Sequence, residues 1–177
     1  MKLMGYQREN GHFGVRNHVL IIPTSVCATD TAEKIAAQVP GAIAIPNQHG
    51  CCQIGSDLAL TQQTIVGFGK NANVGACVVV GLGCDGIQAR AVAEEIRTTG
   101  KRVEVVVIQE EGGTLKTIEK AVRVARQMVA DASRVTREPC DISNLMLGIE
   151  CGGSDATSGF GANPAVGNLS DRLVDLG

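Results

Sequence analysis

Aromatic side chains are scarce in this sequence of 177 residues, which has no Trp, one Tyr and three Phe. Proteins that bind single-stranded nucleic acid use aromatic stacking platforms, and those that bind duplexes use basic patches. The chain has neither feature, because 16 Lys and Arg are balanced by 18 Asp and Glu, giving a formal net charge of −2. We therefore expect no nucleic-acid partner.

Long hydrophobic runs are also missing. No apolar run approaches the roughly 20 residues of a transmembrane helix, and no basic N-terminal stretch leads into an apolar signal-peptide segment. We expect a cytoplasmic protein with no membrane partner. Hydrophobic residues nevertheless make up 44% of the chain, which argues against disorder and supports a folded core.

Seven cysteines are present, an odd number, and no pair has the C-x-x-C spacing. A secreted disulfide scaffold would have a denser and even set, and a zinc knuckle would have paired short spacings. Reduced thiols in a cytoplasmic protein fit this pattern best.

Short apolar, β-branched runs alternate with longer amphipathic segments. Strands are predicted at 18–22, 42–45, 76–80, 103–108 and 145–149. Helices are predicted at 30–38, 57–70, 86–98 and 114–132, with a last helix after Pro164. Near-continuous Val and Ile runs are typical of parallel strands that are covered on both faces. The pattern predicts a doubly wound, three-layer, Rossmann-like α/β fold with a mainly parallel sheet of about five strands.

The expected domain organisation is simple. Residues 1–16 form a lead-in segment, and residues 17–177 form the α/β domain. The sequence ends inside the expected last helix, so we interpret the domain as part of a larger fold.

Chemically active side chains follow every predicted strand. The carboxyl ends of parallel strands meet at one edge of a sheet, where open α/β folds bind their ligands. We therefore expect the site at that edge. The loops that follow the five strands contain, in order, Cys27, His49, Cys84, Glu110 and Cys151 with Asp155.

Gly81, Gly83 and Gly86 form a G-x-G-x-x-G pattern between a strand and a helix, which is the dinucleotide-binding fingerprint. An NAD-binding oxidoreductase is therefore an alternative. Asp85 argues against it, because a fixed carboxylate at the helix N-terminus would lie where the pyrophosphate binds. The glycines also fit a tight strand-to-helix turn.

Together these loops resemble the altronate and D-galactarate dehydratases, a family that also includes the large subunit of sulfolactate sulfo-lyase. The resemblance covers nearly the whole chain, and its motifs are Gly5-Tyr6-x-Arg8, Gly14-Val15-Arg16-Asn17, His49-Gly50-Cys51, Gly81-Leu82-Gly83-Cys84, Gln109-Glu110 with Gly112-Gly113, Gly152-Gly153-Ser154-Asp155, Ser158-Gly159 and Ala162-Asn163-Pro164. It implies metal-dependent loss of water from a sugar acid, usually with ferrous iron. It also implies a longer enzyme with a small β-rich domain, either N-terminal or on a separate subunit.

The predicted site combines these motifs with the chemistry of elimination, which needs a base, an acid and stabilisation of an enolate-like intermediate. We assign His49, Glu110 and Asp155 as catalytic residues, and Cys27, Cys84 and Cys151 as ligands of a divalent metal. Thiolate and carboxylate ligands favour Fe²⁺, with Mn²⁺ or Zn²⁺ as alternatives. The glycine-rich loop is assigned to substrate binding through Gly152, Gly153, Ser154 and Asn163.

The expected substrate is altronate, galactarate or sulfolactate, between which the sequence does not choose. We also expect a homo-oligomer. A non-catalytic scaffold or dimerisation domain of a larger enzyme is the remaining alternative.

Overall fold

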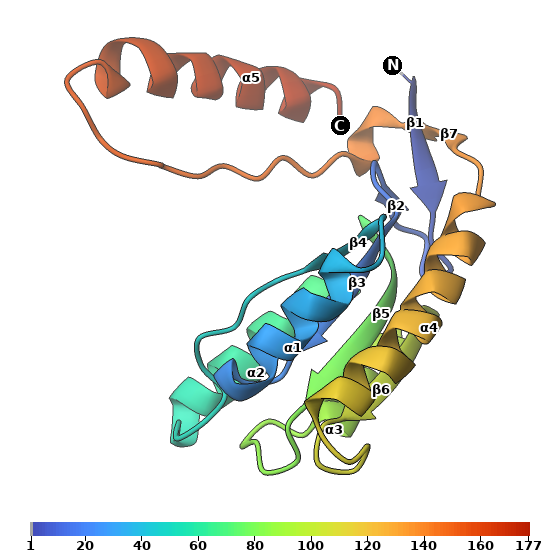
Figure 1. Cartoon of the computed structure of the whole chain (residues 1–177). Coiled ribbons are helices and arrows are strands. Elements are labelled where there is room, and N and C mark those ends of the chain that lie inside the picture. The colour runs from blue at the N-terminus through green and yellow to red at the C-terminus, as the bar shows by residue number, and fades with distance from the viewer. Residues whose placement is uncertain (1) are drawn as a thin grey trace.

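A computed structural model describes residues 2–177. It has two parts: a body of residues 2–145 and an arm of residues 146–177 that extends away from it (Figure 1). No helix among residues 2–177 is long and apolar enough to cross a membrane.

The main sheet of the body has four parallel strands in the order β4-β3-β5-β6. Its strands are β3 (His18–Pro23), β4 (Ala42–Ala44), β5 (Val74–Gly81) and β6 (Arg102–Val107). The two central strands are almost entirely buried, as their apolar runs predict. The α/β prediction is confirmed, with four strands in the parallel sheet.

Helices cover both faces of this sheet and complete a three-layer structure. They are α1 (Val26–Ala37), α2 (Gly55–Lys70), α3 (Ala89–Arg97) and α4 (Thr114–Ser133). On one face, α1 and α4 bury a cluster that includes Ile35, Val78 and Met128. On the other face, α2 and α3 bury a cluster that includes Leu20 and Ile96.

The start of the chain belongs to a second, antiparallel sheet with the order β2-β1-β7, at the opposite end of the body from the carboxyl ends of the main strands. Its strands are β1 (Lys2–Gln7), β2 (Phe13–Gly14) and β7 (Glu138–Asp141), followed by the short helix η1 (Ile142–Asn144). Strand β7 is not among the predicted strands, because its four residues lack a regular apolar pattern.

The Arg8 guanidinium connects this small sheet to the part of the body that contains the main sheet. It donates to Ala72 O at 2.7 Å, Asn17 Oδ1 at 2.8 Å and Arg16 O at 3.0 Å. Gly14 lies so close to the segment before β5 that a Cβ there would be 2.0 Å from Ala72 O. The first two motifs of the resemblance therefore include residues that join two sheets.

The arm corrects one prediction. Residues 145–149 form no strand but an extended segment, in which Met146 and Ile149 are 89% and 66% exposed. The apolar composition suits a strand, but the segment pairs with no other strand. The helices η2 (Ser158–Ala162) and α5 (Asn163–Asp175) follow, and neither buries a residue.

Candidate functional site

The loops at the carboxyl edge of the main sheet, residues 24–25, 45–54, 82–88 and 108–113, form the candidate site. The chain leaves β3 toward α1 on one face, and it leaves β5 toward α3 on the other face. Neighbouring strands whose connections diverge in this way define a topological switch point, where open α/β sheets bind ligands. This switch point lies between residues 24–27 and 82–88.

Asp85 joins the two loops at this switch point through hydrogen bonds. Its buried carboxylate accepts hydrogen bonds from the hydroxyls of Thr24 and Ser25 in the loop after β3. It also accepts from the backbone N–H groups of Leu82 at 2.6 Å and Gly83 at 3.3 Å. The N–H groups that would bind a pyrophosphate are thus occupied by the protein's own carboxylate, so the loop geometry argues against dinucleotide binding.

Packing explains the glycines of that loop. A Cβ on Gly83, which has a φ of +122°, would lie 2.6 Å from the Gln109 side chain, and one on Gly81 would lie 3.0 Å from Ala89 Cβ. These close contacts explain Gly81 and Gly83 of the G-x-G-x-x-G pattern without a bound dinucleotide.

The loop that carries His49 lies directly on the start of α1. Val26 N donates to His49 O at 2.8 Å, and Thr29 Oγ1 donates to Asn47 O at 2.8 Å. Gly50 has a φ of +84°, and a Cβ there would be 2.1 Å from Thr24 O. Only glycine allows this close approach, which explains the Gly in His49-Gly50-Cys51.

This approach gathers thiols. The Sγ atoms of Cys51 and Cys52 lie 3.8 Å apart, and Cys27 is a direct neighbour of Cys51. The hydrogen bond from Cys52 raises the pKa of the Cys51 thiol, and the nearby Cys27 adds to the effect. Cys27 and Cys52 are exposed, whereas Cys51 is half-buried.

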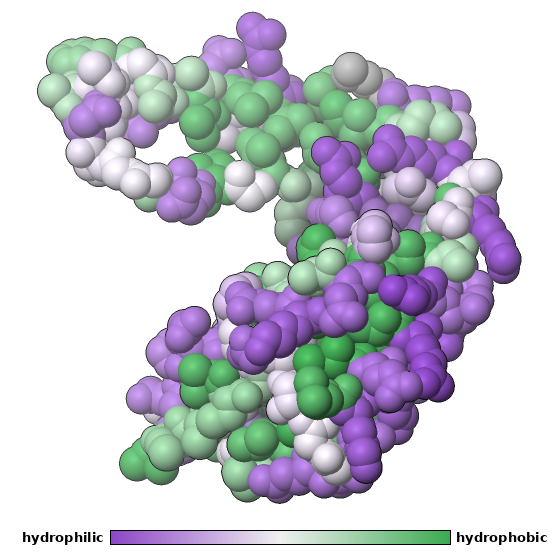
Figure 2. Space-filling model, in the orientation of Figure 1, coloured by the Kyte–Doolittle hydropathy of each residue, from purple (hydrophilic) through white to green (hydrophobic). Residues whose placement is uncertain are grey.

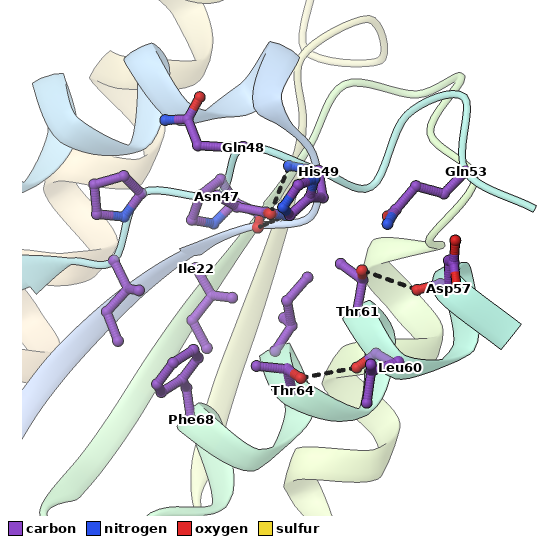
Figure 3. A pocket seen from close by; sticks show the side chains of 14 residues that line it. Ile22, Asn47, Gln48, His49, Gln53, Asp57, Leu60, Thr61, Thr64 and Phe68 are labelled. Carbon is purple, nitrogen blue, oxygen red and sulfur yellow. Dashed lines mark hydrogen bonds between the residues drawn. The ribbon is translucent and has the colours of Figure 1, made fainter. Parts of the chain in front are cut away.

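His49 lines a cavity of about 500 Å³ between this loop and α2 (Figure 3). Its floor is apolar, with Ile22 and Phe68 among the lining side chains. The rim is polar, and it includes Asn47, Gln53 and Asp57 together with His49. The cavity has room for a small acid, but none of its described lining residues is a Lys or an Arg.

Glu110 lies at the same edge but is bound in an ion pair. Arg90 on α3 donates to both of its carboxylate oxygens, at 2.9 and 2.6 Å. Arg90 therefore lowers the pKa of the Glu110 carboxyl group. Both side chains are largely exposed, and as placed Glu110 acts as an ion-pair partner rather than as a free base.

The predicted site residues of the arm lie apart from this edge. Cys151, Gly152, Gly153 and Ser154 are all exposed, and so is Asn163 at the start of α5. Asp155 accepts hydrogen bonds from Thr157 Oγ1 and N, both at 2.6 Å, and from Ser158 N. These hydrogen bonds lower the pKa of the Asp155 carboxyl group, with the Thr157 hydroxyl as the largest cause. The structure therefore gathers Cys27, His49, Cys84 and Glu110 at one edge and leaves the arm residues outside it.

Comparison with known proteins accounts for the two parts. Residues 5–133 match the model of the D-galactarate dehydratase/altronate hydrolase second domain, and residues 142–177 match that of the D-galactarate/altronate dehydratase C-terminal domain. The chain belongs to the D-galactarate/altronate dehydratase family. This membership confirms the resemblance that the motifs indicate.

Relatives of three kinds are similar to this family member. It is 44% identical to the (2R)-sulfolactate sulfo-lyase subunit beta of Chromohalobacter salexigens over 98% of this chain and 44% of the relative. It is 33% identical to the altronate dehydratase of Bacillus subtilis over 98% of this chain and 36% of the relative. It is also 35% identical to the galactarate dehydratase of Escherichia coli over 65% of this chain. The chain thus spans less than half the length of these relatives.

A divalent metal does not fit the residues as they are placed. Among residues 2–177, no group of three His, Cys, Asp or Glu side chains could hold a metal ion. Cys27 lies in the first turn of α1, Cys84 lies in the loop after β5, and Cys151 is on the arm. The predicted ligand set is therefore not assembled within the part of the family fold described here.

Sequence reasoning placed the Asp85 carboxylate where a pyrophosphate would bind, but it missed the roles of Ser25 and Cys51 and the contact between Ser25 and Asp85. Strand order carried the missing signal: β3 neighbours both β4 and β5, so the loops after these three strands must touch. A sequence alone lists the strands in chain order, which separates Ser25 from Asp85 by 60 residues.

Proposed function

We propose that this chain is part of a carbon–oxygen lyase that eliminates water from a hydroxy acid such as altronate or galactarate. The observation that carries the proposal is the match of residues 5–133 and 142–177 to two domains of one dehydratase family. Because the chain covers under half of its relatives, we assign it a portion of the active site rather than the whole.

Elimination begins with removal of a proton from the carbon next to the substrate carboxylate. His49 is the best-placed base, because its imidazole lines a cavity of about 500 Å³ at the carboxyl edge. A neutral imidazole can accept such a proton near neutral pH. The Asn47 side chain accepts a hydrogen bond from His49 N at 3.0 Å, which helps to fix the loop that carries the ring.

The charge of the substrate needs a partner that the cavity does not supply. An acid substrate is anionic, yet the described lining residues include Asp57 and no cationic side chain. We propose that this partner lies outside the described residues, and that it is either a cationic side chain of another domain or a divalent metal, Fe²⁺ by family resemblance, whose ligands come from another domain. Such a metal would stabilise the enolate-like intermediate.

We expect a further subunit or domain to supply the group that binds the substrate carboxylate. One relative is the beta subunit of its enzyme, so we propose that this chain also works with a further subunit or domain, of the small β-rich kind that the resemblance implies. A homo-oligomer remains our expectation for the assembled enzyme.

A sulfo-lyase is the second candidate, favoured by the higher identity to the sulfolactate enzyme, 44% against 33% for altronate dehydratase. The two reactions share the first step and differ in the leaving group, which is sulfite in one and hydroxide in the other. One site can therefore be tested for both.

The test is to assay the complete enzyme that contains this chain with altronate, galactarate and sulfolactate separately. Loss of water gives a 2-oxo acid alone, whereas loss of sulfite gives a 2-oxo acid and one equivalent of sulfite. A 2-oxo acid from any of the three supports a lyase, and sulfite identifies the second candidate. No 2-oxo acid from any of them would overturn the proposal.

Replacing the proposed base is the residue-level test. His49→Ala should reduce kcat by roughly a hundredfold or more, because a general base contributes on this scale. His12→Ala is the matched control, since His12 is exposed near the other end of the body and lines a different cavity. Equal kcat values for the two variants would remove His49 from the mechanism.

Metal dependence is tested by removing the metal. Dialysis of the complete enzyme against a chelator should abolish 2-oxo acid formation, and Fe²⁺ under anaerobic conditions should restore it. Full activity in the chelated enzyme, with metal content confirmed as negligible, would leave the carboxylate to a cationic side chain.

A further inference from the structure

Three of the seven thiols lie together at the carboxyl edge, and none of them has a role in packing the core. Cys27 lies in the first turn of α1, and Cys51 and Cys52 lie in the loop between β4 and α2. Cys27 and Cys52 are exposed and Cys51 is half-buried, so solvent reaches the group.

Backbone contacts, rather than the thiols themselves, hold the group in place. Val26 N donates to His49 O at 2.8 Å, one residue before Cys27 and two before Cys51. A Cβ on Gly50 would lie 2.1 Å from Thr24 O and 3.0 Å from Ser25 Cα, so the two segments are in direct contact. Backbone contacts therefore hold the segment that carries Cys27 against the segment that carries Cys51.

We propose that Cys27 and Cys51 form a thiol–disulfide exchange site, which is converted to an intrachain disulfide by a low-molecular-weight disulfide such as oxidised glutathione. The site differs from the elimination chemistry and does not rest on it. It needs only the two segments that the hydrogen bond between Val26 and His49 joins.

The reaction balances in two exchange steps. The exposed Cys27 thiolate attacks one sulfur of oxidised glutathione; a bond forms between Cys27 Sγ and that sulfur, and the first glutathione leaves as a thiolate. The Cys51 thiolate then attacks Cys27 Sγ and expels the second glutathione thiolate. Two protein thiols are oxidised to one disulfide, and one glutathione disulfide is reduced to two glutathione thiolates, which take up the two protons that the protein thiols release.

Cys51 is the expected partner of Cys27 rather than of its neighbour Cys52. A disulfide between adjacent residues closes a strained eight-membered ring, and the Sγ atoms of this pair lie 3.8 Å apart rather than at bonding distance. Cys52 also has a φ of +60°, a left-handed conformation that the adjacent ring would have to accommodate. A bond from Cys27 to Cys51 does not close such a ring and does not include Cys52.

The disulfide would act on the candidate site through the loop. The backbone of His49 already bonds to α1, and a covalent link two residues later would prevent the loop from moving away from the helix. Because exchange with glutathione is reversible, the position of this loop would follow the ratio of oxidised to reduced glutathione.

The test is to equilibrate the chain, and separately the enzyme that contains it, with mixtures of oxidised and reduced glutathione, and then to alkylate and digest with trypsin. Cleavage after Arg16, Lys34 and Lys70 places Cys27 on peptide 17–34 and both other thiols on peptide 35–70. The expected product is a cross-link of these two peptides that is lost on reduction. Wild type and Cys52→Ser should form it, whereas Cys27→Ser and Cys51→Ser should not.

Cys84→Ser is the matched control, because Cys84 is exposed on the next loop and bonds to Gln109 rather than to a thiol. It should cross-link like wild type. The proposal is overturned if peptide 35–70 carries an internal disulfide, if Cys51→Ser still cross-links, or if oxidised glutathione yields only mixed disulfides on each cysteine. These readouts count bonds rather than turnover, so their failure is distinguishable from failure of the lyase proposal.

Discussion

The body and the arm respond differently to the same kind of sequence pattern. In the body, apolar runs become strands that are buried on both faces, as in β5, where six successive residues from Ala76 to Gly81 are buried. In the arm, the apolar run 145–149 stays extended and exposed, and α5 forms without burying a residue. Figure 2 shows apolar surface on the arm, where Phe160 is 89% exposed.

The difference lies in the availability of partners. A helix satisfies its backbone hydrogen bonds locally, so α5 forms in isolation within the described chain. A strand needs a neighbouring strand, and the segment 145–149 has none. The family comparison draws a similar boundary, since its two models match residues 5–133 and 142–177.

Adding one methyl group to each part tests the difference in packing between the body and the arm most directly. Gly14→Ala in the body would place a Cβ 2.0 Å from Ala72 O and 2.6 Å from Ala72 C, so the backbone of one sheet must move. We expect a loss of about 3 kcal/mol in the free energy of unfolding, as for severe overpacking. Urea denaturation measures the effect.

Gly148→Ala is the matched control for this change, because nothing lies within 4 Å of a Cβ at that position of the arm. It should alter the free energy of unfolding by less than about 0.5 kcal/mol. Similar values for the two variants would show that the close contact between Gly14 and Ala72 does not stabilise the body.

Much of the body could be predicted from the sequence, because periodicity and burial agree there. The predicted strand 18–22 and helix 114–132 match β3 and α4 to within one residue at each end. The site was harder to predict, because its contacts are nonlocal and depend on strand order. Glu110 is paired with Arg90, 20 residues earlier, and no local pattern encodes that ion pair.

A smaller effect concerns the buried Lys101 of the body. Its Nζ donates to Gly69 O at 2.9 Å and Asn71 O at 2.6 Å, at the end of α2. Burial lowers the pKa of Lys101 to about 8. Between that pH and the usual lysine pKa, the unfolded chain binds a proton that the folded chain has released, so the contribution of Lys101 to stability rises with pH.

We therefore expect the free energy of unfolding of wild type, minus that of Lys101→Met, to increase from pH 8 to about pH 10.4. Wild type becomes more stable relative to the variant over this range. The gain should not exceed about 3 kcal/mol, which is the full value of a shift of this size for a buried group. Both proteins should carry Cys77→Ala, because burial raises the pKa of Cys77 to about 12 while Lys101 lowers it, so the contribution of Cys77 would not cancel in the difference. A difference that stays constant with pH would contradict the cause assigned to the lowered pKa of Lys101.

The smallest effect is expected from removing the arm itself. Truncation after Leu145 deletes η2 and α5, which bury nothing, and retains the hydrogen bond of 2.8 Å from Leu145 N to Ile142 O that closes η1. The urea midpoint should change by less than about 0.5 kcal/mol in equivalent stability, and chymotrypsin should cleave the intact chain first within residues 146–176. A clear loss of stability on truncation would mean that the arm packs on the body in solution.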